Sequence, residues 1–383
     1  MGILIRNGFI YDGNGNPPFK GDVLIHGENI VKVGGIEKRR VKKIIDASNA
    51  VVMPGFIDIG GALNLDLDIF SSDCEENYVK QGITTVIGGN GGFSLAPISK
   101  NSLHLIDGLR TRGRVNINWN SVKELFNTVK RFGLMINFGT LVGYSNLRNI
   151  VYRGEPRDLT DNELNFLKRI LSQALNDGAC GLSFLPSPNS QNIFNHEMRA
   201  LAEIVASKGR LFCIEGGNVS NLEALVESAV NFAGELNLNV EINGFQSLKN
   251  LKEIYETANI NFGYAPFNDK DEFIPAPNSI ISSVGVSALP FSNLAETVFL
   301  KLIRSAKDFE NIALENIVSK ITFLPAKKYG IKKRGLIKEN YKADINILRD
   351  GMPSEVLVNG RLVLDGGEIQ KIKSGAIITP AFF

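Results

Sequence analysis

The sequence predicts an α/β protein that combines a (β/α)8 barrel with a small β-sandwich domain built from both chain ends. Short strand-like segments, interrupted by Gly, Asn and Asp, are found near the two ends, at residues 3–12, 21–35, 41–46, 343–348 and 355–369. Between them, apolar strand-like segments alternate with amphipathic helical segments, which is typical of parallel βαβ units. We therefore expect residues 1–51 plus 332–383 to form the sandwich and residues 52–331 to form the barrel.

Eight strand-like segments in the middle region match the eight strands of such a barrel. They lie at residues 52–61, 84–89, 135–142, 181–186, 210–215, 239–244, 259–266 and 279–286. The helical segments lie at residues 71–81, 120–132, 160–177, 195–208, 219–236, 246–257 and 291–307. Thr160 and Glu163 have the spacing of a capping box, which predicts that a helix begins at this point.

Composition excludes several classes of partner. The 383 residues carry 42 basic and 40 acidic side chains, a formal net charge of +2, so charge does not favour nucleic acid or anionic lipid. No apolar run reaches the roughly 18 residues that a membrane-spanning helix needs. The three cysteines are far apart in the sequence, which favours reduced thiols over disulfides or a CxxC site. We expect a cytoplasmic protein with no nucleic-acid or membrane partner.

Five segments carry a resemblance to a known family. They are PGFIDIGGA (54–62), QGITTVIGGNGGFSLAP (81–97), LVGYSNLR (141–148), GACGLSFLP (178–186) and residues 314–348. In this order they resemble the N-acyl-D-amino-acid deacylases (D-aminoacylases), a branch of the amidohydrolase superfamily. The resemblance implies the barrel fold, and it implies descent from enzymes that cleave amides with a metal-activated water.

The resemblance also implies where that family binds its metal, and there this sequence departs from it. The family's ligand and base positions fall at Gly60, Ala62, Gly91, Tyr144, Glu215, Asn243 and Val284. Gly, Ala and Val offer no donor atoms, whereas a catalytic zinc site needs about three protein ligands. With only three histidines in the chain (His26, His104 and His196), we expect no metal cofactor and no hydrolysis by the inherited mechanism.

Three carboxylates form an alternative set of candidate catalytic residues. Side chains alternate between the two faces of a strand, so Asp58 shares a face with positions 60 and 62, Glu215 with Cys213, and Glu241 with Asn243. These carboxylates are candidates for weak binding of a divalent cation such as Mg2+ or Mn2+. The alternative is that backbone, hydroxyl and loop donors satisfy them as ordinary packed residues.

Two functional hypotheses follow. The first is an amidohydrolase-fold protein without amide hydrolysis, which binds a small molecule in the barrel mouth or acts as a regulatory or partner subunit. Its protein partner would be a second copy of the chain or an intact homologue. The second is a hydrolase that cleaves a non-peptide C–N bond, in an N-acyl amino acid or a cyclic amide, through an atypical site. Whether the chain is an enzyme therefore stays open, and the missing ligands favour a protein that is not.

Overall fold

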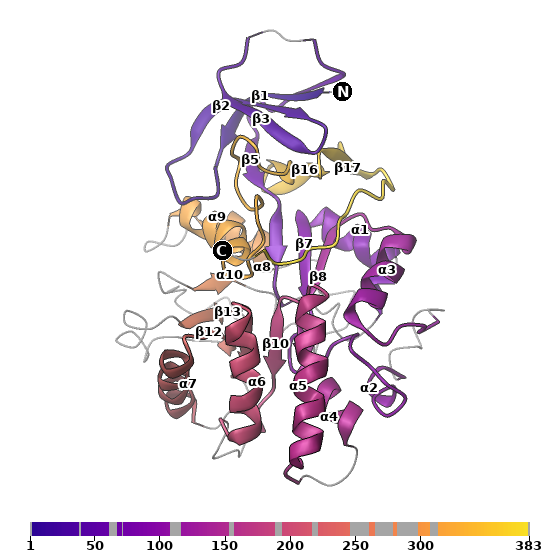
Figure 1. Ribbon diagram of the computed structural model, residues 1–383. Coiled ribbons are helices and arrows are strands. Elements are labelled where there is room, and N and C mark those ends of the chain that lie inside the picture. The colour runs from indigo at the N-terminus through magenta and orange to yellow at the C-terminus, as the bar shows by residue number, and fades with distance from the viewer. Residues whose placement is uncertain are drawn as a thin grey trace.

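The computed structural model confirms the predicted fold class (Figure 1). It describes residues 2–37, 40–60, 67–70, 72–107, 116–152, 157–187, 194–216, 221–245, 260–264, 279–281, 298–306 and 313–381. Two of the positions discussed above, Ala62 and Val284, lie outside these residues, as does the predicted helix at 246–257. In the described part, no helix is long and apolar enough to cross a membrane.

Strands from both chain ends form one nine-stranded sheet. Its order is β18-β17-β16-β15-β5-β1-β2-β3, with β4 paired to β1. The two ends meet at β5, which pairs antiparallel with β15 and parallel with β1. The exact boundaries predicted for the two domains stay predictions. The strands are Gly2–Ile10 (β1), Phe19–His26 (β2), Asn29–Gly34 (β3), Lys43–Asp46 (β4), Val51–Pro54 (β5), Ile345–Arg349 (β15), Met352–Val358 (β16), Arg361–Asp365 (β17) and Glu368–Ile369 (β18).

The barrel strands follow one another in sequence order and all pair in parallel. One sheet has the order β6-β7-β8, and the second runs from β9 to β14. Only Leu141 separates β8 from β9, so these two occupy a single one of the eight strand positions. The strands are Phe56–Asp58 (β6), Ile83–Gly88 (β7), Asn137–Thr140 (β8), Val142–Gly143 (β9), Gly181–Phe184 (β10), Leu211–Glu215 (β11), Asn239–Phe245 (β12), Ile260–Tyr264 (β13) and Ile280–Ile281 (β14).

Helices cover the outside of the barrel, and α5, α6 and α7 lie side by side there (Figure 1). The predicted capping box is present, because Thr160 Oγ1 accepts the Glu163 N–H and the Glu163 carboxylate accepts the Thr160 N–H. The helices are Asp68–Phe70 (η2, a 3-10 turn), Ser72–Lys80 (α1), His104–Asp107 (α2), Val122–Phe132 (α3), Tyr144–Val151 (α4), Asp161–Asn176 (α5), His196–Ser207 (α6), Leu222–Leu236 (α7), Val298–Ser305 (α8), Leu314–Ile321 (α9) and Phe323–Lys328 (α10).

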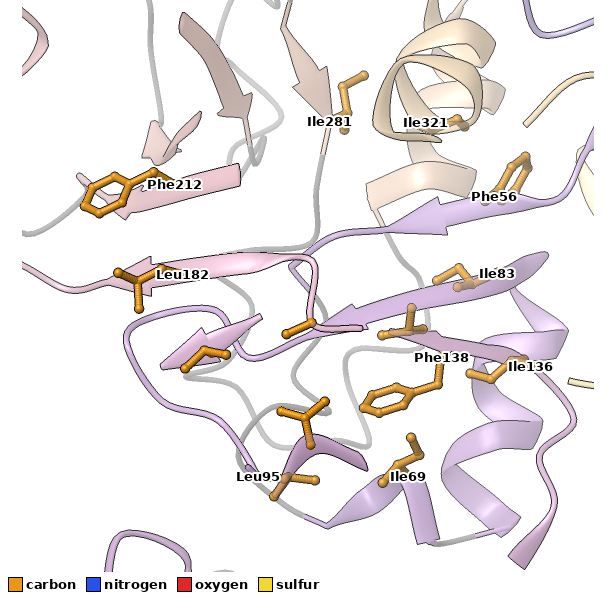
Figure 2. Packing of buried hydrophobic residues seen from close by; sticks show 14 of the residues in the cluster. Phe56, Ile69, Ile83, Leu95, Ile136, Phe138, Leu182, Phe212, Ile281 and Ile321 are labelled. Carbon is orange, nitrogen blue, oxygen red and sulfur yellow. The ribbon is translucent and has the colours of Figure 1, made fainter. Parts of the chain in front are cut away.

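Two apolar clusters define the two faces of the barrel strands. The larger cluster lies between strands and helices, and Figure 2 shows part of it, including Phe212 from β11 and Ile321 from α9. A second cluster joins side chains from strands around the barrel and therefore fills its interior, with Ile57, Ile87, Leu141, Cys213 and Ile280 among its members. Membership of one cluster or the other shows which apolar strand residues face the helices and which face the barrel interior.

Candidate functional site

The neighbouring strands β11 and β12 bring four polar side chains to the barrel interior. Their register pairs Cys213 with Glu241 and Glu215 with Asn243. Cys213 belongs to the interior cluster, and alternation along each strand places the other three on the same face. The residues between them pack in the outer cluster, as this alternation requires: Phe212, Ile214, Val240 and Ile242. Glu215 and Asn243 lie toward the carboxyl ends of their strands, where barrel proteins place functional residues.

Hydrogen bonds link Asn90, Cys213 and Asn243 in the barrel interior. Asn90 donates from Nδ2 to the carbonyl oxygens of Ile59 and Ile87, the latter at 3.2 Å. Its Oδ1 faces the Cys213 thiol at 3.6 Å, and Asn243 Nδ2 lies 3.0 Å from the same sulfur. Carbonyl oxygens only accept, so the Asn90 amide is fixed in orientation.

The orientation of Asn90 determines the orientation of Asn243. Asn90 Oδ1 accepts, so the Cys213 sulfur gives it the single thiol hydrogen. The sulfur then has no hydrogen left, and Asn243 must face it with its amide nitrogen. The Asn243 Oδ1 is therefore left as an acceptor, and it is buried without a hydrogen-bond partner among the described residues.

Glu241 is fully buried and only partly satisfied. The Tyr329 hydroxyl donates to its Oε1 at 3.1 Å, whereas its Oε2 has no partner in the described part of the chain. Burial raises the pKa of Glu241 to about 7, although the charge of Lys328, the hydrogen bond from Tyr329 and the nearby Asn243 side chain act in the opposite direction. Lys328 Nζ itself is held by Asn239 Oδ1 at 2.7 Å and the Val240 carbonyl at 3.1 Å.

Glu215 is partly buried at the end of β11. Burial, and next the charge of Glu241, raise the pKa of Glu215 to about 7. The negative charge of Glu241 disfavours ionisation of Glu215, as a neighbouring like charge does. A carboxyl group that titrates near neutral pH is suited to general acid–base chemistry.

Cys180 and Cys213 do not fit the role of nucleophile. Burial raises the pKa of the Cys180 thiol to about 12 and that of Cys213 well above its usual value, so both stay protonated. A nucleophilic cysteine also needs a nearby base such as histidine, and His196 is exposed at the start of α6.

The structure corrects the prediction that Asp58 faces the barrel interior. Ile57 and Ile59 on either side of it pack in the interior cluster, and Asp58 aligns with Val86, which packs in the outer cluster. The prediction carried strand alternation through to position 62, but β6 ends at Asp58. The chain then bends, and Asp58 Oδ1 accepts the Gly60 N–H at 3.1 Å.

The described positions at which the sequence resemblance places the family's metal ligands lie in different surroundings. Gly60 lies in the bend after β6. Gly91 has φ +64°, and a Cβ built on it would meet no atom of the described residues within 4 Å. Tyr144 donates its hydroxyl to Glu197 Oε1 at 2.7 Å and accepts from Arg148 Nε at 3.2 Å, which ties α4 to α6.

These side chains do not fit a catalytic zinc ion. All three histidines of the chain are described, and all three are exposed, so no imidazole reaches the barrel interior. In the described part, no group of three or more His, Cys, Asp or Glu side chains is arranged to hold a metal. Of the corresponding positions that the structure describes, Glu215 and Asn243 are the two with donors in the interior, where zinc needs about three ligands.

Comparison with known proteins supports the branch that the sequence resemblance named. The chain is 30% identical over 235 residues to the N-acyl-D-glutamate deacylase of Alcaligenes xylosoxydans xylosoxydans, covering 60% of this chain and 46% of that protein. It is 28% identical over 192 residues to the D-aminoacylase of the same organism, covering 47% of this chain and 37% of the relative. The aligned part thus spans less than half of each relative. No protein-family model matches the sequence.

Solved structures give the same picture of the fold. A D-aminoacylase structure superimposes with a TM-score of 0.83 at 19% identity, covering 98% of this chain and 99% of that one. The N-acyl-D-glutamate deacylase of Bordetella bronchiseptica, solved with zinc and a phosphonate inhibitor, gives 0.80 at 21% identity and the same coverage. These relatives and structural neighbours are D-aminoacylases and N-acyl-D-glutamate deacylases. The predicted resemblance to this branch is therefore confirmed.

Sequence reasoning missed the side chains that surround Glu241. Lys328 ends α10 and Tyr329 follows it, after the last barrel strand, and the Tyr329 hydroxyl contacts Glu241 across 88 positions of sequence. Neither side chain belongs to a strand, so no strand pattern could place it inside the barrel.

Proposed function

We propose that the chain is a D-aminoacylase-fold protein that binds a small molecule at the carboxyl ends of its barrel strands and does not hydrolyse amides with a metal-activated water. The observation that carries this proposal is the exposure of all three histidines, which leaves the barrel interior without imidazole ligands. Activation of water by zinc depends on such ligands, and with too few donors the ion is not held.

The substituted positions support the same conclusion. Tyr144 is engaged with Glu197 and Arg148 between two helices, and Gly91 offers only backbone in an open space. A site that had exchanged one metal for another would keep converging donors at these positions. The chain instead uses them for packing and turns.

The protein partner in this proposal is a second copy of the chain or an intact homologue, for which it would act as a regulatory subunit. A cytoplasmic location is also part of the proposal. Both rest on the sequence alone.

The test measures turnover and metal content together. Purified protein is incubated with N-acyl-D- and N-acyl-L-amino acids, with and without added Zn2+, Mn2+ or Mg2+. We expect no turnover and less than about a tenth of an equivalent of bound metal, since a structural or catalytic site would retain close to one. Metal-dependent turnover by the wild-type chain would overturn the proposal.

A second candidate function is hydrolysis of a C–N bond without the inherited metal site. Glu215 favours it, because a carboxyl group with a pKa of about 7 can exchange a proton with a substrate at neutral pH. Turnover that persists in chelator and is abolished in Glu215→Gln, but not in the matched surface variant Glu235→Gln, would establish this function in place of the first.

A further inference from the structure

Among the described residues, no hydrogen-bond donor reaches several acceptors on the interior face of β11 and β12. Glu241 Oε2 and Asn243 Oδ1 are both buried without a hydrogen-bond partner among the described residues. The described part also shows no hydrogen bond to the Glu215 carboxylate, which is paired in register with Asn243. Unpaired acceptors in a protein interior cost free energy unless a bound group donates to them.

The hydrogen bonds around the Asn243 amide fix which of its atoms can accept from a ligand. The carbonyl oxygens of Ile59 and Ile87 orient Asn90, which orients the Cys213 thiol and in turn the Asn243 amide. Turning the Asn243 amide around would break the bond from its nitrogen to the sulfur, so its Oδ1 stays presented as an acceptor. The ligand must therefore supply N–H or O–H donors.

The charges in this group favour a cation. When both glutamates are ionised they carry two negative charges, against at most one positive charge on Lys328, because burial lowers the pKa of Lys328 to about 8. The Cys213 thiol and the Tyr329 hydroxyl stay protonated and neutral, because burial raises the pKa of each. One bound positive charge would balance the group. A protonated primary amine has three N–H donors, one for each acceptor group.

We propose that Glu215, Glu241 and Asn243 form a binding site for the ammonium head of a small primary amine. This deepens the proposed binding function and rests on it. D-aminoacylases act on N-acylated amino acids, in which the nitrogen is an uncharged amide, so the inference assigns this chain a ligand of different chemistry. The Glu215 and Asn243 end of the site lies nearest the strand ends, and the remainder of the ligand would extend from there.

The test uses methylammonium chloride as the probe, measured by calorimetric titration and by the shift in melting temperature. Tetramethylammonium chloride supplies the positive charge without N–H donors, and KCl and NaCl control for ionic strength and for inorganic cations. We expect methylammonium to bind and stabilise the protein, while the other salts do not. Glu215→Gln should weaken methylammonium binding by about tenfold to a hundredfold, the range for losing one charge-assisted hydrogen bond. Glu235→Gln, on the exposed surface of α7, should leave it unchanged.

Three outcomes would overturn the inference. They are no methylammonium binding, equal stabilisation by tetramethylammonium or KCl, and equal binding by the wild type and Glu215→Gln. If these acceptors bind only water, methylammonium should not bind. Because Glu215→Gln leaves the strand intact, its melting temperature reports separately whether it folds. Absence of amine binding in a chain that also fails to hydrolyse amides would remove this inference alone, whereas metal-dependent hydrolysis would remove the proposed function.

Discussion

Asn137 Nδ2 lies 3.1 Å from Asp344 Oδ2, a hydrogen bond that joins residues 207 positions apart. Asn137 begins the barrel strand β8, and Asp344 immediately precedes β15 of the terminal sheet. Asp344 also accepts the backbone N–H of Asn359 at 2.7 Å and pairs with Arg334. Asn359 in turn donates to Asn137 Oδ1 at 2.8 Å. This buried network connects the barrel to the sheet formed by the chain ends.

Asp344→Ala should lower the free energy of unfolding by about 3–5 kcal/mol, because it leaves the buried Arg334 guanidinium without its carboxylate. Urea unfolding measures the change. The control is Glu235→Ala, which removes the partner of Arg199 in an ion pair whose side chains are 44% and 54% exposed, and should cost less than about 1 kcal/mol. Similar losses in the two variants would contradict the role of this network.

The raised pKa of Glu215 predicts a pH-dependent difference in stability. A carboxyl group whose pKa is higher in the folded state binds more protons when folded, so stability falls as pH rises from the unfolded value near 4.5 through about 7. Glu215→Gln, which stays neutral, should equal the wild type near pH 4. It should be more stable above pH 8, by on the order of 1–3 kcal/mol.

Urea unfolding of both proteins across pH 4 to 9 measures that difference, and the Glu235→Gln control should show none of it. If the two proteins differed in free energy of unfolding by the same amount at all pH values, burial and Glu241 would not shift the pKa of Glu215. The expected gain in stability and loss of amine binding in the same variant would mark Glu215 as a functional rather than a packing residue.

Cys180 and Cys213 should resist alkylation in the folded protein. Both are buried, and their pKa values are raised by burial, so little thiolate exists at pH 8. Iodoacetamide labelling followed by peptide mapping should show both unmodified in native buffer and modified in denaturant. Rapid native labelling of Cys213 would indicate that the hydrogen bonds joining it to Asn90 and Asn243 do not persist in solution.

The fold class could be predicted from the sequence because it depends on the local periodicity of apolar residues. Apolar strands and amphipathic helices alternate regularly, and strand alternation also places Glu215 and Glu241 on the interior face. It fails at Asp58, where the strand ends in a bend that no periodic pattern marks. The surroundings of the site could not be predicted either, since Tyr329 reaches Glu241 only through the tertiary fold.

Gly91→Cys should fold and should not restore hydrolysis. Space for the side chain is available, since a Cβ at Gly91 meets no atom of the described residues within 4 Å, so the main cost is the backbone φ of +64°. A non-glycine residue in this left-handed region costs on the order of 1 kcal/mol. Gly181→Ala is the contrasting variant, because its Cβ would lie 1.9 Å from the Leu211 carbonyl oxygen, a backbone atom held in the barrel. Gly181→Ala should lower the free energy of unfolding several times more than Gly91→Cys, as overpacking in a core does.

Urea unfolding compares the two variants, and measurements of zinc content and N-acyl-amino-acid turnover test Gly91→Cys for function. We expect no turnover, because one added thiolate leaves the interior without imidazole. Zinc-dependent turnover by Gly91→Cys would show that the barrel still holds most of a metal site.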